Sequence, residues 1–252
     1  MKAAFYSTDV SENLRAVTVK FSLVIPTYQE AMGIERLIHA LCTLFRDNHL
    51  DGEIVVVDDH SPDGTGDIVE RLMAEGYPVR CLHRPGKLGL SSGVIDGWKF
   101  ARADSEILGV MDADFSHDVK ILPQMIGAFM AEYDLVVGSR YVAGGGIEDW
   151  PWFRKMTSIV AIALAKPLTP VRDITSGYFF VRRHAIEGVV LDPIGFKIGL
   201  EVIAKARYRS FLEVPYVFTD RVAGTSKLNQ NVIFNYLQQL VRVYRGRLIG
   251  RG

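Results

Sequence analysis

Apolar residues along this chain fall into two alternating patterns. Short, mostly apolar runs predict buried strands at 21–25, 53–57, 78–82, 107–111 and 135–138. Between these runs, apolar residues recur at three- and four-residue spacing, as at Ile34, Leu37, Ile38 and Leu41, which predicts helices. This alternation predicts an α/β fold, doubly wound, with a mainly parallel sheet and helices on both faces.

The pattern changes after Arg140. Three consecutive glycines, 144–146, predict a hinge or a loop whose backbone can approach a phosphate closely. Trp150 and Trp152 then precede a weakly amphipathic stretch at 156–164, which suits either a membrane interface or a core helix packed on the sheet. Beyond it, 199–208 is predicted to be a helix and 211–218 a final strand.

The C-terminal tail is basic and amphipathic. No acidic residue follows Asp220, and the apolar residues of 231–249 recur at helical spacing with arginines between them. Such a helix lies on an anionic membrane surface or docks a partner helix; alternatively, it packs on its own domain. We therefore expect an N-terminal segment at 1–20, one α/β domain at 21–228 and a basic amphipathic helix at 229–252.

Composition adds the class of protein and its compartment. With 252 residues, 48% hydrophobic and 23% charged, the chain is an ordinary globular protein, and its net charge of zero gives no argument for a nucleic-acid partner. The longest apolar run, 159–165, is far shorter than the roughly 20 residues that span a bilayer. With two isolated cysteines and no secretory signal, we expect a peripheral protein on the cytosolic side of a membrane, or a cytosolic one.

Unusual polar residues stand where three of the predicted strands end. They are the PTYQE sequence at 26–30, the pair Asp58 and Asp59, and Asp112 with Asp114. In open parallel sheets, ligands bind outside the carboxyl ends of the strands. These three strand ends are therefore predicted to form one site.

Asp112 and Asp114 are the candidates for a metal site. Their side chains lie on the same side of an extended chain, because side-chain direction there has a period of two. Mg²⁺ and Mn²⁺ take oxygen ligands, and Mg²⁺ commonly joins one or two carboxylates to substrate phosphates. Ser116, next in the alternation, can supply a third oxygen. A solvated turn is the alternative, but the end of a buried strand favours a metal that holds a diphosphate.

Ligands for a nucleotide surround these carboxylates. Glu30 and Asp59 can accept hydrogen bonds from a base or a ribose, or serve only as favourable charges at helix N-termini. Tyr28 can stack on a base or simply pack. Arg221 and Lys227 flank a glycine-containing loop after a strand, which can close over a diphosphate. The six histidines show no zinc-ligand spacing.

Eight segments in sequence order carry a family resemblance. VIPTYQE, VVVDDHSPDGT, RPGKLGLSSGVIDGWKFA, MDADFSH, GSRY, TSGYFFVRR, GFKIGLEVIAKA and EVPYVFTDRVAGTSK follow one another from residue 24 to 227. Together they resemble the dolichol-phosphate mannose synthases, within the inverting glycosyltransferases of family 2 with a GT-A fold. The resemblance implies transfer of mannose from GDP-mannose to a polyprenyl phosphate, with inversion at the anomeric carbon.

The resemblance also implies roles for individual residues. The nucleoside would be held by Pro26, Tyr28, Glu30, Val57 and Asp59. The metal, Mg²⁺ or Mn²⁺, and the diphosphate would be held by Asp112, Ala113, Asp114 and Ser116. Phosphates would be held by Arg140, Arg221 and Lys227, and Arg154 would receive the lipid phosphate or aid the leaving group. The lipid phosphate is already an anion, so no catalytic base is assigned.

The chain departs from the family pattern without losing a proposed ligand. Gln29 stands where Asn is usual, and His60 where a small or acidic residue is commoner. Many relatives carry C-terminal membrane spans, and the shorter type without them relies on amphipathic segments or on small membrane-anchoring subunits. Two alternatives stay open: the same reaction with another sugar nucleotide, such as UDP-glucose, or a non-catalytic nucleotide-sugar-binding subunit.

Overall fold

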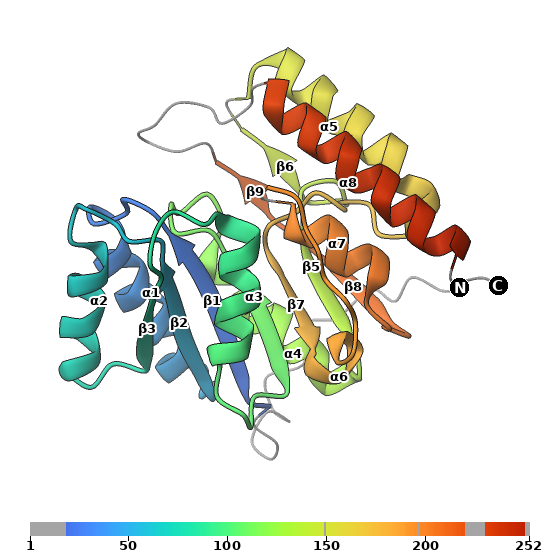
Figure 1. Cartoon of the computed structure of the whole chain (residues 1–252). Coiled ribbons are helices and arrows are strands. Elements are labelled where there is room, and N and C mark those ends of the chain that lie inside the picture. The colour runs from blue at the N-terminus through green and yellow to red at the C-terminus, as the bar shows by residue number, and fades with distance from the viewer. Residues whose placement is uncertain (1–18, 149, 196, 220–229, 250–252) are drawn as a thin grey trace.

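A seven-stranded sheet forms the centre of the molecule (Figure 1). The computed structural model describes residues 19–148, 150–195, 197–219 and 230–249, and the strand order of its main sheet is β3-β2-β1-β4-β7-β5-β8. The strands are β1 (Phe21–Thr27), β2 (Gly52–Asp58), β3 (Val79–His83), β4 (Ile107–Val110), β5 (Leu135–Ser139), β7 (Phe179–Arg182) and β8 (Phe211–Pro215). A second, two-stranded sheet pairs β6 (Gly146–Ile147) with β9 (Val217–Phe218).

The predicted mainly parallel sheet is confirmed, with one reversed strand. β7 runs antiparallel to both of its neighbours, β4 and β5, whereas the other pairings in the main sheet are parallel. This strand was missed from the sequence because a run of four residues does not by itself distinguish a strand from a short helix or a loop. The single strand expected at 211–218 is divided: β8 joins the main sheet and β9 pairs with β6.

Helices cover both faces of the sheet, as predicted. One face packs against α1 (Ile34–Asp47), α2 (Thr65–Ala74) and α4 (Leu122–Gly127). The other packs against α3 (Leu90–Phe100), α7 (Ile198–Lys205) and α8 (Gln230–Ile249). The short helix α6 (Arg183–Ile186) follows β7, and 3₁₀ turns lie at Val119–Ile121, Ala128–Ala131 and Lys166–Leu168.

The strand alternation explains why both faces are apolar. In β1, Phe21, Leu23 and Ile25 belong to the core beneath α1, whereas Val24 belongs to the opposite core beneath α3. Helix α3 approaches β1 closely at Gly97, where an added Cβ would lie 2.6 Å from Cγ1 of Val24. This close approach brings the N-terminal end of α3 next to the ends of β1 and β2.

Helices α5 (Trp152–Ala165) and α8 lie side by side at one end of the molecule (Figure 1). The hydroxyl of Tyr236 donates to the carbonyl oxygen of Ala161 (2.5 Å), and that of Tyr244 donates to the carbonyl oxygen of Leu164 (2.8 Å). Within the described residues, no helix combines the length and apolarity needed to cross a membrane.

Candidate active site

The carboxyl ends of β2, β1 and β4 lie next to one another along one edge of the sheet. β1 pairs with β2 on one side and with β4 on the other, so Thr27 lies opposite Asp58, and the backbone N–H of Met111 donates to the carbonyl oxygen of Val24 (3.1 Å). The predicted gathering of three polar strand ends therefore occurs. Each of the three loops holds a non-glycine residue with left-handed backbone: Gln29 (φ 60°), His60 (φ 58°) and Phe115 (φ 58°). Such conformations cost on the order of 1 kcal/mol each and are concentrated at functional sites.

The loop after β1 is fastened to the loop after β2. Backbone N–H groups of Gln29, Glu30 and Ala31 donate to side chains of the second loop, at Ser61 Oγ (2.9 Å), Thr65 Oγ1 (3.0 Å) and Asp63 Oδ2 (3.1 Å) respectively. Burial by itself would raise the pKa of the Asp63 carboxyl, but hydrogen bonds from the hydroxyl and N–H of Thr65 and from the N–H of Ala31 lower it. This network fixes the backbone of 29–31, directly after Tyr28, which was predicted together with Glu30 to contact a nucleoside.

Asp58 and Asp59 have separate roles. Asp58 organises its own loop, since its carboxylate accepts from the N–H and the hydroxyl of Ser61 (2.9 and 2.5 Å). Asp59, only 6% exposed, accepts from Arg84 Nη1 (2.6 Å) and from the N–H of Gly89 (2.7 Å). Asp59 and Arg84 thus form a buried charged pair at the strand end, beside the buried side chain of Val57.

Tyr28 has one cation against its ring. Lys87 Nζ lies 3.8 Å from the ring centroid of Tyr28, which is half-buried, as is its neighbour Pro26. A cation over an aromatic face is a favourable contact. A base that stacks on Tyr28 would therefore lie on the opposite face of the ring or displace Lys87.

The loop after β4 presents the D-x-D sequence. Asp112 and Asp114 are half-buried, whereas Ala113 points into the core. The N–H of Ser116 donates to Asp114 Oδ1 (3.0 Å), which closes the loop on itself. The Ser116 hydroxyl is buried, and no hydrogen-bond partner for it is found among the residues that the structure describes.

These residues fit a divalent cation bound together with a diphosphate. A buried hydroxyl without a partner calls for a ligand, and carboxylate and hydroxyl oxygens are the donors that Mg²⁺ and Mn²⁺ take. In the described part of the chain, no three His, Cys, Asp or Glu side chains gather as a metal site. Asp112, Asp114 and Ser116 would therefore need oxygens of a bound substrate to complete the coordination.

His117 supports the backbone of the D-x-D loop through a hydrogen bond. Its Nδ1 accepts from the backbone N–H of Asp112 (3.1 Å), and its ring stacks on Tyr178 with centroids 5.1 Å apart. Burial lowers the pKa of His117, although the charges of Asp112 and Asp114 oppose the shift. A neutral imidazole whose Nδ1 already accepts a hydrogen bond acts as a support for the loop backbone.

Arg140 is held by a carboxylate that the sequence analysis did not single out. Asp173, which is 0% exposed, accepts from Arg140 Nε (2.8 Å), Nη2 (2.7 Å) and the backbone N–H (3.0 Å). Burial by itself would lower the pKa of the guanidinium, but the charge and hydrogen bonds of Asp173 raise it well above its usual value. Arg140 is thus a fixed cation at the end of β5.

Arg154 and Lys197 bring further positive charge toward Arg140. The guanidinium of Arg154, in the first turn of α5, lies 4.0 Å from the ring of Trp150, and Arg140 lies 5.5 Å from the same ring. Burial lowers the pKa of Lys197 to about 8, and Arg140 acts in the same direction, whereas Asp173 and Asp112 oppose it. Lys197 therefore lies within electrostatic reach of both the D-x-D loop and the Arg140–Asp173 pair.

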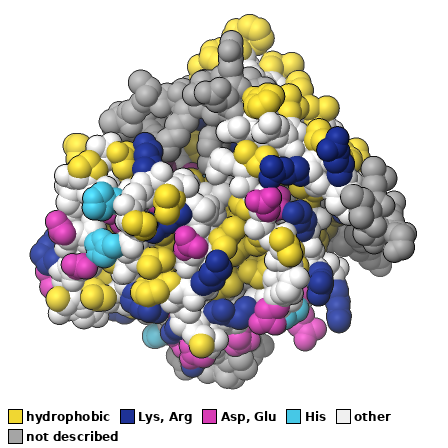
Figure 2. Space-filling model, viewed as in Figure 1, with side chains coloured by type: hydrophobic (Ala, Val, Ile, Leu, Met, Phe, Trp, Pro, Cys, Tyr) yellow, Lys and Arg dark blue, Asp and Glu magenta, His cyan; other side chains and the backbone are white. Residues whose placement is uncertain are grey.

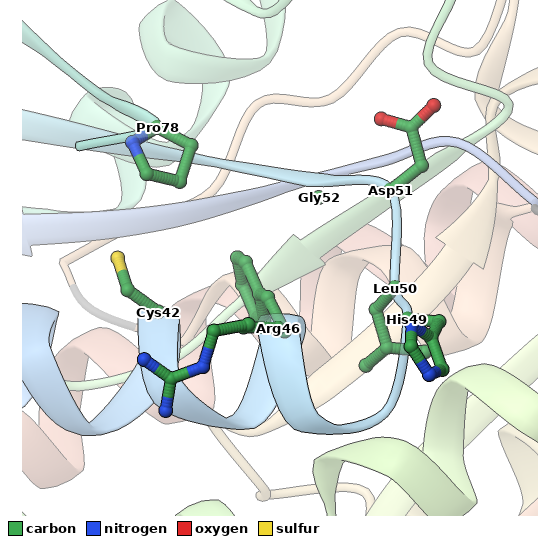
Figure 3. Close-up of a pocket in the computed structure, with 8 residues that line it drawn as sticks. Cys42, Arg46, His49, Leu50, Asp51, Gly52 and Pro78 are labelled. Atoms are coloured by element: carbon green, nitrogen blue, oxygen red, sulfur yellow. The ribbon is translucent and has the colours of Figure 1, made fainter. Parts of the chain in front are cut away.

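One pocket in the described part of the chain lies away from this site. It has a volume of about 470 Å³ and is lined by residues from the end of α1 and the start of β2, among them Arg46 and Gly52 (Figure 3). This is the opposite edge of the sheet from Asp59 and Asp112. Arg221 and Lys227, the remaining predicted phosphate ligands, lie outside the described residues.

Comparisons with known proteins agree with this geometry. The model of glycosyl transferase family 2 matches residues 22–190. A curated relative from Pyrococcus furiosus, a dolichol-phosphate mannosyltransferase, is 42% identical over 90% of this chain, which spans 64% of the length of that relative. A second dolichol-phosphate mannosyltransferase, from Mycosarcoma maydis, is 36% identical over 91% of this chain and 81% of its own. The chain belongs to glycosyl transferase family 2, among the dolichol-phosphate mannosyltransferases.

Solved structures confirm the GT-A-like fold of this glycosyltransferase. A mannosyltransferase from Pyrobaculum calidifontis, solved in complex with GDP-Man and Mn²⁺, superposes with a TM-score of 0.61 at 18% identity, covering 95% of this chain and 67% of its own. Asp173 and Lys197 are the site residues that sequence reasoning missed. Lys197 had one available signal, an isolated lysine between apolar residues in the GFKIGLE segment.

Proposed function

We propose that this chain transfers mannose from GDP-mannose to the phosphate of a polyprenyl lipid at the cytosolic surface of a membrane. The observation that carries the proposal is the D-x-D loop, whose buried Ser116 hydroxyl has no hydrogen-bond partner among the described residues. Lys197 lies within electrostatic reach of both this loop and Arg140, which Asp173 holds in place. Membership of the dolichol-phosphate mannosyltransferases supplies the substrates: the curated relatives carry that name.

In the proposed reaction, the bond between the anomeric carbon and the β-phosphate oxygen of GDP-mannose breaks, and its electron pair leaves with GDP. An oxygen of the lipid phosphate forms the new bond on the opposite face of the sugar, which inverts the anomeric carbon. The acceptor is already an anion, so no residue has to remove a proton. Orientation of the two substrates in line supplies much of the rate enhancement.

The residues of this chain act mainly through charge. A divalent cation held by Asp112, Asp114 and Ser116 would neutralise the charge that develops on the leaving diphosphate. Arg140 is held in place by Asp173 before the substrate arrives, so it stabilises phosphate charge with little reorganisation. We assign Arg154, and with it Arg221 and Lys227, to the donor and acceptor phosphates, while Glu30, Tyr28 and Asp59 contact the nucleoside.

The membrane surface is assigned from the exposed face of α5 and α8. Only Ala165 of α5 is fully buried, and its exposed apolar side chains are Trp152, Phe153, Met156, Ile159, Val160 and Leu164. α8 adds Phe234, Leu237 and Val241. Figure 2 shows hydrophobic side chains gathered at the top of the molecule over these two helices. Exposed arginines such as Arg245 and Arg247 complement anionic headgroups.

An activity assay tests the proposal. The purified chain should release GDP from GDP-mannose only when a polyprenyl phosphate and Mg²⁺ or Mn²⁺ are present, and UDP-glucose in the same assay tests the other donor. Asp114→Asn should reduce transfer by at least about a hundredfold, because a metal ligand is lost. Asp118→Asn is the matched control, since the Asp118 carboxylate caps the 3₁₀ turn by accepting from the N–H of Lys120 (2.9 Å) and Asn can keep that bond. Equal activity of the two variants would refute the metal assignment.

A flotation assay tests the surface separately. Replacing Phe153 and Met156 with Gln should weaken binding to liposomes that contain anionic lipid, because each buried apolar side chain contributes about 1.5–3 kcal/mol. Met73→Gln in α2, which removes a similarly exposed methionine elsewhere on the molecule, should leave flotation unchanged. If both changes have the same effect, α5 is not the docking surface.

A further inference from the structure

Helix α8 is joined to the start of α7, where Lys197 lies. The side chain of Gln239 in α8 is 0% exposed, and its Nε2 donates to the carbonyl oxygen of Lys197 (3.0 Å) and to Glu201 Oε2 (3.2 Å). Lys197 directly precedes the first residue of α7, and Glu201 lies in the first turn of that helix. A single amide of the C-terminal helix therefore holds the segment that carries a lysine of the candidate site.

Two further contacts join α8 to the chain that leads into α7. Arg242 Nη1 donates to Asp192 Oδ2 (2.9 Å), and a Cβ added to Gly195 would lie 3.5 Å from Nδ2 of Asn235. Residues three and four apart are neighbours on a helix surface, so these contacts and that of Gln239 come from one face of α8. The Arg242 pair is exposed and contributes little, which leaves the buried Gln239 as the contact that fixes the position.

Gln239 and the apolar side chains assigned to the membrane lie on different faces of α8. Phe234, Leu237 and Val241 are 42–60% exposed, whereas Gln239 is buried and bonded to the start of α7. A replacement of Gln239 therefore changes the contact between two helices of the domain and leaves the exposed apolar face as it is.

Lys197 is the part of the candidate site that this contact reaches. Its ammonium group lies within reach of the negative charges of Asp112 and Asp173 and of the positive charges of Arg140 and Arg154. The energy between two charges depends on their separation, so the position of a cation decides how much it stabilises a developing phosphate charge. A misplacement of about 1 Å at such a site can cost on the order of a hundredfold in rate.

The surroundings of Gln239 allow its contact to be removed while the domain stays folded. Glu201 keeps two other partners, since its Oε1 accepts from the N–H of Asp192 (3.0 Å) and from Lys205 Nζ. The Oε1 of Gln239 is buried, and it has no hydrogen-bond partner among the residues that the structure describes. Gln239→Met therefore removes an unsatisfied acceptor together with the two hydrogen bonds, which limits the loss of stability.

We propose that Gln239 is a positioning residue that holds Lys197 in place for the transfer of mannose. The inference rests on the proposed function and adds to it a residue that touches neither substrate. Gln239 acts through the backbone of Lys197, and the ammonium group of Lys197 acts on the phosphates. Helix α8 then belongs to the active site as well as to the docking surface.

A double-mutant cycle tests the proposal. Transfer of mannose from GDP-mannose to a short-chain polyprenyl phosphate is measured in detergent, so that docking on a membrane does not enter the result. The variants are Gln239→Met, Lys197→Met and the two combined. Gln238→Met is the matched control, because Gln238 is the neighbouring residue of the same helix and is exposed. Urea unfolding gives the folded fraction of each variant, and kcat/KM is expressed per folded protein.

We expect Gln239→Met to lower kcat/KM about tenfold, since losing a partner that orients a functional group costs roughly 10–100-fold, and Gln238→Met to leave it unchanged. Adding Gln239→Met to Lys197→Met should have no further effect, because the group that Gln239 positions is then gone. Single-turnover measurements with excess enzyme resolve the low rates of the Lys197→Met variants.

Three results would overturn the proposal: no loss from Gln239→Met, full activity of Lys197→Met, or a loss from Gln239→Met that persists undiminished in the Lys197→Met background. The last of these would mean that Gln239 supports the fold and does not act through Lys197. A wild type that transfers mannose to no polyprenyl phosphate refutes the proposed function itself, which is a different result.

Discussion

The buried pair of Arg140 and Asp173 offers a direct test of how the site is held together. Asp173 is 0% exposed, and its carboxylate accepts three hydrogen bonds from Arg140, at 2.7, 2.8 and 3.0 Å. Asp173→Asn keeps the size of the side chain and one carbonyl oxygen but removes the counter-charge of a guanidinium that is only 8% exposed. The backbone N–H of residue 173 still donates to Glu213 (3.0 Å), so the loop keeps its anchor on β8.

We expect Asp173→Asn to lower the free energy of unfolding by about 3 kcal/mol. Removing one partner of a buried ion pair costs roughly 3–5 kcal/mol, because the remaining charge is uncompensated in a poorly solvated environment. Asn retains one acceptor, which places the variant at the lower end of that range. In a chain of this size, each kcal/mol lowers Tm by about 2–4 °C, so the midpoint should fall by about 10 °C.

Thermal and urea unfolding, followed by circular dichroism, measure this loss. The control is Asp104→Asn, which breaks the Lys20–Asp104 pair. Its two charged atoms are 2.6 Å apart, close to the 2.7 Å of the Arg140–Asp173 pair, but both side chains are about half exposed. Exposed pairs contribute only about 0–1 kcal/mol. Adding Arg140→Met to Asp173→Asn should recover part of the stability, because the uncompensated charge is gone. If Asp173→Asn costs no more than Asp104→Asn, the buried pair does not hold Arg140.

Three further predictions concern packing, thiols and charge. Gly97→Ala should lower the free energy of unfolding, measured in urea, by about 1–3 kcal/mol, because the added Cβ would lie 2.6 Å from a β1 side chain. Gly127→Ala in α4 is the control: its added Cβ meets nothing within 4 Å among the described residues, so it should be neutral or slightly stabilising. Burial raises the pKa of Cys42 to about 11 and of Cys81 to about 12, so both should react with iodoacetamide at pH 8 at least about tenfold more slowly than a free thiol; equal rates would contradict this. Lys197, with a pKa of about 8, loses its positive charge as pH rises, so kcat/KM should fall above pH 8. Lys197→Arg should move that fall to higher pH, because Arg stays charged. An unchanged pH profile in this variant would show that Lys197 takes no part in the mechanism.

The strand ends of the site could be predicted because their positions follow from local rules. An apolar run that stops at a carboxylate marks the end of a buried strand, and parallel strands place such ends on one edge. The order β2-β1-β4 then brings Asp59 and Asp112 to that edge on either side of Tyr28. The division of roles between Asp58 and Asp59 could not be predicted, because it depends on Ser61, Arg84 and Gly89 folding back on them.

The pairing of Arg140 with Asp173 could not be predicted by such rules, because it depends on the order of the strands in the sheet. Asp173 is 33 residues away in the chain and precedes β7, the antiparallel strand that the pattern did not reveal. Only the return of β7 beside β5 brings the two residues together. Lys197 is similar, since its position near Arg140 and Asp112 depends on how α7 begins. Long-range pairings of this kind need the strand order, and the periodicity of a single sequence does not contain it.

The amphipathic pattern of the C-terminal helix α8 allowed two interpretations, packing on its own domain or docking on a membrane or partner. The structure has one face of α8 suited to each. Tyr236, Leu240 and Val243 of α8 are buried in the core, as a helix packed on its own domain requires, whereas Leu237 and Val241 are exposed, as a docking helix requires. The buried Gln239 between them donates from Nε2 to the carbonyl oxygen of Lys197 (3.0 Å) and to Glu201 (3.2 Å). Deleting the tail would therefore expose the core beside Lys197 and impair activity, even in an assay without a membrane. Replacements confined to the exposed face, such as Leu237→Gln or Val241→Gln, leave the buried face in place and therefore separate docking from folding.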